Sequence, residues 1–254
     1  MSSSHHVIAR RILGVRVDDV TYADTLDACR TALVARQPRQ IVTLNTEMLM
    51  IARRDWHLAS IVEHAYLVTP DGVGLLLAGR LLGQKLREQV TGTDLLPRLA
   101  RLAAEEGWRL FLLGARPGVA ALAARNLSEQ FPRLQVAGTH AGSPTEPLEG
   151  EITALVRATH PDVLLVAFGV PAEEKWIARN LERLEVPLVI GVGGAFDFTA
   201  GAVPRAPLWM RQRGLEWLYR LGRQPWRWRR MLALPRFLGL VLAEAAASRV
   251  RLRR

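Results

Sequence analysis

Residues 163–192 read VLLVAFGVPAEEKWIARNLERLEVPLVIGV, and no other segment of the chain indicates the fold class so clearly. The segment holds two apolar runs of strand length, at 163–168 and 187–192. Between them, residues 173–184 place apolar side chains at spacings of three and four, with charges in between. Strands that are apolar throughout are typical of parallel sheets, whose neighbouring strands are joined by crossover helices. The segment therefore predicts a β-α-β unit.

The same alternation fills the sequence on the N-terminal side of this unit. Further strand-like runs lie at 41–44, 65–68, 109–113 and 134–137. Further helical patterns lie at 93–106, 119–130 and 149–159, and a polar loop containing proline covers 141–150. Several helical patterns begin or end at Pro or Gly, as helices commonly do. We expect an α/β fold: a Rossmann-like, mostly parallel sheet flanked by helices.

Charge is distributed unevenly over the 254 residues. The chain has 34 bases and 24 acids, but residues 203–254 alone contain thirteen Arg, two Glu and four of the seven Trp. Residues 1–202 are left with 21 bases and 22 acids and are nearly neutral. This split predicts two parts with different tasks: a Rossmann-like body over 1–202 and a helical, basic C-terminal appendage over 203–254.

The appendage interleaves aromatic and basic side chains. Arginines border an apolar stripe, which is typical of a helix that lies at a membrane surface. The stripe consists of Leu208, Trp209, Leu215, Trp217, Leu218 and Leu221. Interleaved Trp and Arg also suit binding of a diphosphate, and nucleic-acid binding produces a similar pattern. The structural alternative is a basic helix that packs on the body and binds nothing.

Bulk features bear on the compartment. The single cysteine, Cys29, excludes an internal disulfide framework and suits a reducing compartment. Residues 1–6 lack the apolar stretch of a signal peptide. The apolar segment 231–247 is interrupted by a proline and two charged residues, and it is shorter than the roughly 20 residues needed to span a bilayer. We expect a cytoplasmic protein whose C-terminal segment lies on a membrane without crossing it.

Ligands of open parallel sheets bind beyond the carboxyl ends of the strands. At the first such end, Thr43 and Asn45 alternate with apolar residues, so both point to one side and can hydrogen-bond one ligand. A turn that satisfies Asn45 and an N-cap at Thr46 are the structural alternatives. Asp71 follows the next strand, where it can act as a general base or cap the helix that begins there.

Glycines and a proline-led helix start mark other strand ends. Gly72 and Gly74 let the backbone approach a ligand closely, and so do the glycines of GVGG, residues 191–194, for which a plain tight turn is the alternative. The run GVPAEEKW, residues 169–176, opens a helix with proline at an early position and acids in the first turn. Interaction of the acids with the helix dipole accounts for that arrangement without a ligand. Its place after a strand puts it near the expected cleft.

Several motifs of metal and cofactor chemistry are missing from the sequence. There is no Asp-x-Asp tripeptide and no H-x-x-x-H pair among the six histidines. There is also no G-x-x-x-x-G-K-[ST] loop, no G-x-S-x-G elbow and no G-x-G-x-x-G fingerprint. We therefore expect transfer chemistry that needs neither a metal nor a cofactor.

Six blocks, in order, resemble the WecG/TagA/CpsF family of bacterial glycosyltransferases over about residues 41–230. The blocks are TLN at 43–45, PDGVG at 70–74, VTGTDL at 90–95, GVP with EKW within 169–176, GVGGAFDF at 191–198, and RAP at 205–207 with GLEWLYR at 214–220. The resemblance implies an inverting, metal-independent hexosyltransferase that moves a sugar from a UDP-sugar to a polyprenyl-diphosphate-linked sugar. Such enzymes build precursors of teichoic acid and other cell-surface polysaccharides, and the best-known branch transfers N-acetylmannosamine.

The resemblance also assigns roles to residues. Asp71 matches the proposed catalytic base, and Thr43 and Asn45 match polar residues of the sugar pocket. The arginines of the appendage match an element that closes on the diphosphate and touches the membrane, and they are Arg205, Arg211, Arg220 and Arg223. Further substrate contacts are expected from the matching blocks and their neighbours at Gly72, Gln89, Thr91, Gly92, Glu173, Gly193, Gly194 and Asp197. No residue is expected to bind a metal.

Gln89 and Glu173 depart from the family pattern. Many members have arginine before Val-Thr-Gly, where this chain has Gln89, and many have Pro-x-Gln-Glu, where this chain has Glu173. The first change removes a cation from near the expected diphosphate. The second adds a negative charge near the sugar pocket. Both bear on the choice of donor more than on the class of reaction.

The implied partners are a UDP-sugar, a polyprenyl-diphosphate-linked sugar acceptor and an anionic membrane surface at the inner face of the cytoplasmic membrane. An exposed apolar tail also allows self-association into a homo-oligomer. No nucleic-acid partner is expected. On the residues alone two other classes stay open: a basic nucleic-acid-binding protein that uses the appendage, and an NAD-dependent enzyme, which the missing glycine fingerprint disfavours.

Overall fold

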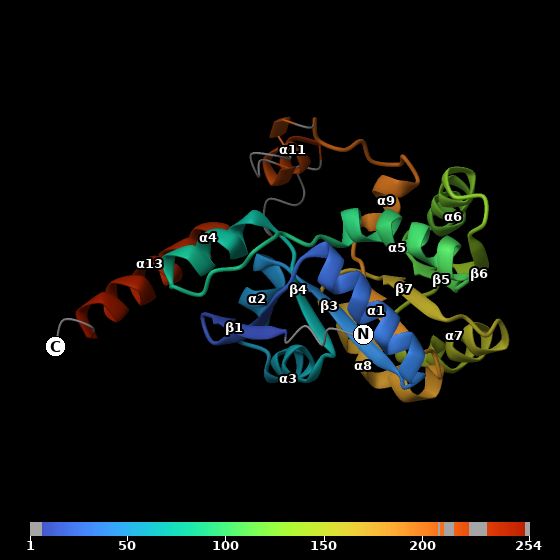
Figure 1. The fold of residues 1–254 in the computed structure, drawn as a ribbon, viewed down its shortest axis with the longest axis horizontal. Coiled ribbons are helices and arrows are strands. Elements are labelled where there is room, and N and C mark those ends of the chain that lie inside the picture. Colours follow the sequence, from blue (N-terminus) through green and yellow to red (C-terminus); the bar gives the residue numbers. More distant parts are fainter. Residues whose placement is uncertain (1–6, 208, 211–215, 224–232, 252–254) are drawn as a thin grey trace.

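The computed structural model describes residues 7–207, 209–210, 216–223 and 233–251, apart from the side chains at 217, 220, 223 and 249–251. At its centre lies a six-stranded sheet in the order β4-β3-β8-β7-β5-β6, and each neighbouring pair is parallel (Figure 1). The strands are β3 (Arg39–Leu44), β4 (Leu67–Pro70), β5 (Arg109–Gly114), β6 (Gln135–His140), β7 (Val163–Ala167) and β8 (Leu188–Gly191). The predicted Rossmann-like α/β fold is confirmed.

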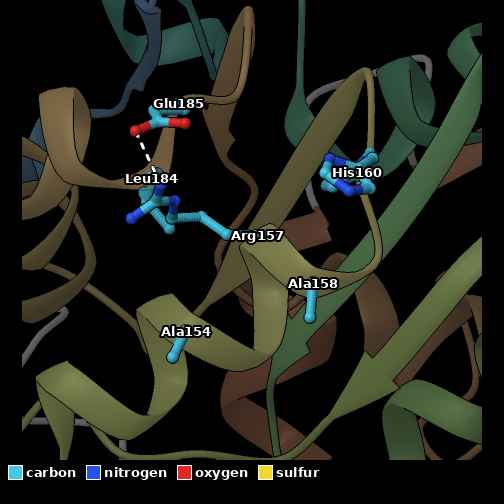
Figure 2. A pocket seen from close by; sticks show the side chains of 7 residues that line it. Ala154, Arg157, Ala158, His160, Leu184 and Glu185 are labelled. Atoms are coloured by element: carbon cyan, nitrogen blue, oxygen red, sulfur yellow. Dashed lines mark ion pairs between the residues drawn. The ribbon is translucent and has the colours of Figure 1, made fainter.

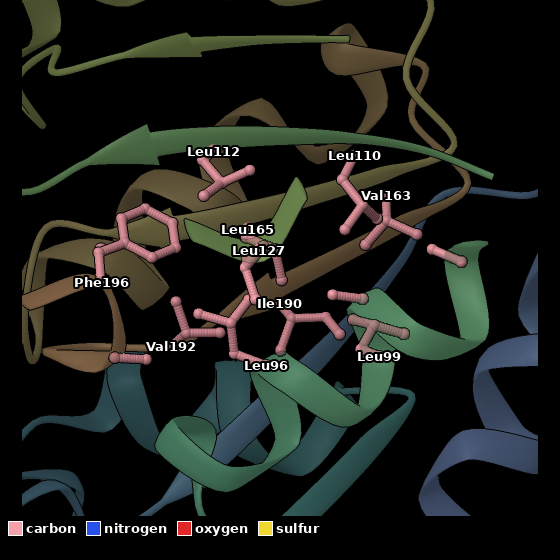
Figure 3. Packing of buried hydrophobic residues seen from close by; sticks show 14 of the residues in the cluster. Leu96, Leu99, Leu110, Leu112, Leu127, Val163, Leu165, Ile190, Val192 and Phe196 are labelled. Atoms are coloured by element: carbon pink, nitrogen blue, oxygen red, sulfur yellow. The ribbon is translucent and has the colours of Figure 1, made fainter. Parts of the chain in front are cut away.

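Helices cover both faces of the sheet, because successive side chains of each buried strand point to opposite faces. On one face, Leu165 and Ile190 pack with side chains of α1 (Tyr22–Ala35), α5 (Gly92–Glu106), α6 (Val119–Gln130) and α9 (Ala195–Thr199), as Figure 3 shows in part. On the opposite face, Leu164 and Val189 pack with α7 (Glu146–Ala158) and α8 (Ala172–Leu184). Near β3 and β4, a separate cluster includes α2 (Thr46–Ala52), α3 (Trp56–His64) and α4 (Val73–Leu81).

An antiparallel hairpin precedes the sheet and was not expected from the sequence. It consists of β1 (Ile8–Ile12) and β2 (Val15–Asp19), and its fully buried Asp18 pairs with Arg16 at 2.9 Å. The Asp18 carboxylate also accepts the Val68 N–H at 2.9 Å, which ties the hairpin to β4. Burial of this charge is tolerated because both of its partners are in place.

The C-terminal residues return to the body. Helix α13 (Ala233–Arg251) packs against α2 and α4, and its Phe237 and Val241 are buried in the same cluster as residues of β3 and β4. In Figure 1, α13 lies beside α4 at one end of the molecule, whereas α11 (Glu216–Arg223) lies apart from both. The division into a body over 1–202 and an appendage over 203–254 stays a prediction. Within the described segments, none of the helices combines the length and apolarity that crossing a bilayer requires.

The loop predicted over 141–150 is wrong in its second half, because α7 begins at Glu146. Pro147 favours a loop when read in isolation, but proline is compatible with the first turn of a helix, where its missing N–H has no partner to lose. Glu146 and Glu149 lie in that first turn and interact favourably with the helix dipole.

Candidate active site

Loops that follow four neighbouring strands meet at the carboxyl edge of the sheet. Leu44 of β3 lies opposite Pro70 of β4, and the Asp71 N–H donates to the Leu44 carbonyl at 2.7 Å. Beyond β8, the Val192 N–H donates to the Val166 carbonyl of β7 at 2.9 Å. The residues that follow these strands are therefore brought side by side, where open parallel sheets bind ligands.

Asp71 lies half-buried at this edge. Its Oδ2 accepts the N–H of Gly92, the first residue of α5, at 3.2 Å. The N-cap of the helix that directly follows, α4, is Gly72, which makes no side-chain cap bond. Asp71 therefore meets the start of a helix 21 residues further on, where a helix N-terminus interacts favourably with a negative charge. The position suits a base that must reach a substrate, because the group is neither sealed in the core nor fully solvated.

Gly72 and Gly74, which follow Asp71, have different structural roles. Gly72 has φ +127°, a conformation that residues with a side chain rarely adopt, and a Cβ added there would meet no atom of the described residues within 4 Å. As far as the chain is described, the backbone of Gly72 therefore borders open space next to Asp71. At Gly74 an added Cβ would lie 2.8 Å from Cγ2 of Thr46, so this glycine allows close packing of α4 on α2. The expectation that Gly74 lets the backbone approach a ligand is not supported, because a helix occupies that space.

Thr43 and Asn45 each make a hydrogen bond within the protein. The buried Thr43 hydroxyl donates to the Gly191 carbonyl at 2.9 Å and so links β3 to β8. Asn45 is the N-cap of α2, where its Oδ1 accepts the Met48 N–H at 2.9 Å. The predicted alternative, an N-cap at Thr46, is displaced by one residue. Asn45 remains half-buried at the strand end, in an orientation that the cap bond fixes.

The start of α5 carries two of the predicted contacts. Thr91 is its N-cap and accepts the Asp94 N–H at 3.1 Å, while the Thr91 N–H donates to the Tyr22 hydroxyl at 3.0 Å. Gly92 packs so closely on the loop after β8 that an added Cβ would lie 3.1 Å from the Val192 carbonyl oxygen. The β8 loop, the start of α5 and Asp71 are thus held in direct contact.

Glu173 lies in the first turn of α8 and is only 1% exposed. Its Oε2 accepts the Gly169 N–H at 2.9 Å, and the N–H groups of Gly193 and Phe168 also hydrogen-bond the carboxyl. Burial raises the pKa of Glu173 to about 7; the three N–H groups oppose the rise, and the negative charge of Asp71 adds to it. Glu173 and Asp71 are therefore close enough to interact through their charges.

Glu174, which was not predicted, is also fully buried. Gln40 of β3 donates its Nε2–H to Glu174 Oε2. Oε1 has no hydrogen-bond partner among the described residues and would lie 2.4 Å from a Cβ added at Gly191. Burial, followed by the charge of Glu173, raises the pKa of Glu174 well above its usual range. A signal existed in the sequence. Glu174 precedes Ile177 and Leu181 by three and seven residues, which places it on the apolar face of α8.

The loop after β8 leads into α9, whose N-cap is Gly194 and which contains Asp197. Gly193 has φ +52°, and its N–H binds Glu173. Asp197 pairs with Arg116 of the loop after β5 at 3.3 Å, with 27% of its side chain exposed. This pairing partly neutralises the Asp197 carboxylate at the same edge of the sheet.

Among the described side chains of the appendage, Arg205 is a basic residue in contact with the site. Its guanidinium pairs with Asp94, in the first turn of α5, at 2.6 Å and lies 3.8 Å from Glu216 of α11. Asp94, the partner of Arg205, follows Gly92 by two residues, and the Gly92 N–H binds Asp71. The appendage therefore contacts the start of α5 directly.

For the remaining predicted contact residues, the structure gives fewer details. Gln89 is half-buried in the loop between α4 and α5, two residues before Thr91. Arg220 and Arg223 belong to α11, whose backbone is described, but their side chains lie outside the described part of the chain. Arg211 lies outside the described residues altogether.

A surface hollow lies elsewhere, at the amino edge of the sheet. It is formed where α7 and α8 end, immediately before β7 and β8 begin (Figure 2). Its lining is Ala154, Arg157, Ala158, His160, Pro161, Leu184 and Glu185. Arg157 and Glu185 pair across it at 2.8 Å. Because the hollow lies at the opposite end of the strands from Asp71, it does not belong to the candidate site. Within the described residues, no three His, Cys, Asp or Glu side chains form a group that could hold a metal ion.

Comparison with known proteins agrees with the sequence motifs. A family model described as "Glycosyl transferase WecG/TagA/CpsF family" matches residues 10–251. An N-acetylglucosaminyldiphosphoundecaprenol N-acetyl-beta-D-mannosaminyltransferase of Bacillus subtilis (strain 168) is 33% identical over 204 residues, which cover 80% of this chain and 79% of that protein.

Proteins of the same name from two other bacteria are also similar. The one from Bacillus spizizenii (strain ATCC 23059 / NRRL B-14472 / W23) is 33% identical and covers 82% of this chain and 80% of its own length. The one from Staphylococcus aureus (strain MW2) is 28% identical and covers 89% of each chain. The match to the family model, which ends at residue 251, covers both the body and most of the appendage.

Proposed function

Because this chain belongs to the WecG/TagA/CpsF family of glycosyltransferases, we propose that it moves N-acetylmannosamine or a related hexose from a UDP-sugar to a sugar carried on a polyprenyl diphosphate. The names of the relatives support this acceptor class and this sugar. The donor, the absence of a metal requirement and inversion at the anomeric carbon are parts of the proposal. The product would enter the synthesis of a cell-surface polysaccharide or teichoic acid.

The observation that carries the proposal is the position of Asp71. Its half-buried carboxylate lies at the carboxyl edge of the sheet and is fixed by the Gly92 N–H. It lies next to Gly72, where an added Cβ would meet none of the described atoms within 4 Å. In the proposed step, Asp71 takes the proton of the acceptor hydroxyl. The hydroxyl oxygen forms a bond to the anomeric carbon, and the bond from that carbon to the diphosphate breaks on the opposite face. One displacement inverts the configuration, and a single carboxylate is enough for the proton transfer.

The leaving diphosphate needs positive charge and N–H donors. We assign this role to the helix starts at the carboxyl edge and to the arginines of the appendage, because guanidinium groups bind phosphate oxygens in pairs. Arg205 supports the assignment, since its pairing with Asp94 brings the appendage to the start of α5. Turnover in this scheme is unchanged by a chelator such as EDTA.

The acceptor lies in a membrane, and one described surface suits contact with it. Leu77 and Leu81 on α4 and Leu238 and Leu242 on α13 are 42% to 51% exposed, and the two helices pack together. We call these four leucines the apolar face. The exposed Arg80 and Arg236 lie on the same two helices. Leucines with neighbouring arginines favour binding to an anionic lipid surface. We assign the protein to the inner face of the cytoplasmic membrane, bound peripherally through this apolar face.

The test is release of UDP from a panel of UDP-sugars, with a short-chain lipid-diphosphate N-acetylglucosamine as the acceptor. We expect acceptor-dependent UDP release, with the highest kcat/KM for UDP-N-acetylmannosamine, both with and without EDTA. Reactions without acceptor control for hydrolysis of the donor. Failure of every UDP-sugar to release UDP in the presence of the acceptor would overturn the proposed reaction, and loss of turnover in EDTA would overturn its metal independence.

A further inference from the structure

Glu173 carries a buried carboxyl group in the centre of the site. The proposed displacement reaction at Asp71 does not require this group. The Glu173 carboxyl accepts hydrogen bonds from the N–H groups of two different loops. Gly169 and Phe168 belong to the loop after β7, and Gly193 belongs to the loop after β8. The side chain therefore fastens two of the loops that form the carboxyl edge. An added Cβ at Gly193 would lie 3.7 Å from Glu173 Oε1, so the second loop passes directly over the carboxyl.

Two other carboxyl groups interact with Glu173 through their charges. Asp71 belongs to the loop after β4, and Glu174 lies in the same turn of α8 as Glu173. The nearest cation along α8, Lys175, is paired with Asp55, the N-cap of α3. Three acidic groups that interact in a desolvated place do not all ionise together near neutral pH, because each charge raises the cost of the next.

We propose that Glu173 is a positioning residue that exchanges a proton with solvent, and that its charge state sets how well the site accepts the anionic donor beside Asp71. The exchange balances as an ordinary acid dissociation, in which the proton passes between the Glu173 carboxyl and water. The proposal rests on the proposed function, because it takes the donor to be a nucleotide diphosphate sugar.

The direction of the effect follows from charge. When Glu173 is protonated, the site holds one negative charge fewer, and a donor that carries a diphosphate binds more tightly. When Glu173 ionises, the donor meets a negative charge in a place where water screens poorly. Since the pKa of Glu173 is raised to about 7, this change falls within the range in which enzymes are assayed. The KM for the donor should therefore rise between about pH 6 and pH 8, while kcat changes less.

The experiment uses the full chain, the Glu173→Gln variant and a matched control. Glutamine has nearly the same shape but stays neutral at every pH. Glu182→Gln makes the same chemical change on the exposed side of the same helix. For the unsubstituted protein and Glu182→Gln, we expect the KM for the UDP-sugar and the Kd for UDP, measured by calorimetry, to rise several-fold up to about tenfold over this pH range. For Glu173→Gln we expect the KM for the UDP-sugar to stay flat and the Kd for UDP to change only through ionisation of the terminal phosphate of UDP, whose pKa is about 6. A rise of equal size in Glu173→Gln would overturn the proposal.

A direct readout covers the cases in which the variant does not fold or UDP does not bind. Carbon-13 NMR of the glutamate side-chain carboxyls, with Glu173 assigned by its substitution or by sequential connectivity, should show Glu173 titrating near pH 7 in the unsubstituted protein. The midpoint should move to lower pH in Asp71→Asn, because the charge of Asp71 is one cause of the shift. Titration near the ordinary glutamate pKa would overturn the proposal even if UDP binds. Absence of UDP binding at every pH, together with titration of Glu173 near 7, would instead overturn the proposed donor.

Discussion

At the scale of single residues, the chemistry depends on a carboxylate that is positioned without being sealed in the core. Asp71 is half-buried, and its Oδ2 accepts the Gly92 N–H at 3.2 Å. Had its carboxylate capped α4, the helix that directly follows it, the group would serve only local structure. Its partner 21 residues away instead fixes it where a loop, a strand end and a helix start meet.

Asp71→Asn tests the role of this carboxylate as a base. Asparagine keeps an oxygen that can accept the Gly92 N–H but cannot take a proton from the acceptor. We expect kcat for transfer to fall by about 10²- to 10⁴-fold with an unchanged thermal midpoint of unfolding. Asp27→Asn, at an exposed carboxylate on α1, is the control and should transfer at the normal rate. Near-normal turnover in a folded Asp71→Asn protein would remove Asp71 from the mechanism.

The raised pKa of Glu173 also predicts how stability depends on pH. The folded protein binds this proton more tightly than the unfolded chain does, since the pKa is about 7 in place of the ordinary 4.5. The stabilisation is therefore fully present below about pH 4.5 and is lost as the pH rises through 7. On its own, Glu173 should lower the free energy of unfolding by up to about 3 kcal/mol over this window.

Urea unfolding of the unsubstituted protein and of Glu173→Gln, measured from pH 4.5 to 7.5, checks this expectation. Other groups titrate in the same range, so the quantity to compare is the difference between the two curves. The difference should change steadily with pH, with the unsubstituted protein losing more stability toward neutral pH. Parallel curves would show that Glu173 titrates with the same pKa in the folded and unfolded chains.

At the scale of elements, close packing around α4 depends on a residue without a side chain. A Cβ added at Gly79 of α4 would lie 2.4 Å from the backbone carbonyl oxygen of Gln84, whose own N–H donates to the Gly79 carbonyl at 2.7 Å. The chain that leaves α4 therefore turns back directly over this glycine. Because the obstacle is backbone, a larger residue could be accommodated only if the turn moved.

Gly79→Ala and Gly150→Ala form a matched pair that tests this packing. Both glycines lie inside helices, but a Cβ added at Gly150 of α7 would meet no atom within 4 Å in the part of the chain that the structure describes. We expect Gly79→Ala to lower the free energy of unfolding by about 1–3 kcal/mol through overpacking. Gly150→Ala should raise it by about 0.5–1 kcal/mol, because alanine favours the helix. Equal effects in urea unfolding would contradict the packing seen at Gly79.

At the scale of the whole molecule, the appendage and the body share a core. Phe237 and Val241 of α13 are buried against α2 and α4, so removal of residues 203–254 would expose apolar surface of the body. Loss of transfer after such a deletion would therefore not separate a catalytic role from a structural one. Substitutions of exposed side chains test the membrane role more cleanly.

The double substitution Leu238→Glu with Leu242→Glu tests the apolar face. These leucines are 51% and 50% exposed on α13, so the change should leave the fold intact while placing two charges against the lipid. We expect binding to anionic phospholipid vesicles to fall at least tenfold in a sedimentation assay. The control is Leu148→Glu with Leu155→Glu on α7, where the leucines are 40% and 42% exposed and vesicle binding should be unchanged. Equal loss in both variants, or in neither, would place the membrane contact elsewhere.

Much of the architecture was predictable at this scale from short patterns. All six strands of the parallel sheet were expected, to within a few residues of their ends. Most of them are buried on both faces and leave uninterrupted apolar runs such as 163–168, whereas the edge strand β6 is partly exposed and overlaps the shorter apolar run 134–137. The hairpin of β1 and β2 was not expected, since its strands IARRI and VRVDD are rich in charge. The hairpin can bury the negative charge of Asp18 because Arg16 pairs with the carboxylate and the Val68 N–H donates to it. Neither partner can be recognised from the sequence pattern.

The candidate site also has features that the sequence predicted and features that only the tertiary structure showed. The motifs predicted five residues of the site, namely Asp71, Thr91, Gly92, Glu173 and Gly193. The strand order explains why these residues, which lie far apart in the sequence, meet at one edge of the sheet. Tertiary structure alone showed that Asp71 binds the start of α5, that Glu174 is buried beside Glu173, and that Arg205 pairs with Asp94. The periodicity of a sequence records which side of one element is covered. The charge state and the partners of a buried group depend instead on every neighbour that displaces water from it, and those neighbours come from distant parts of the chain.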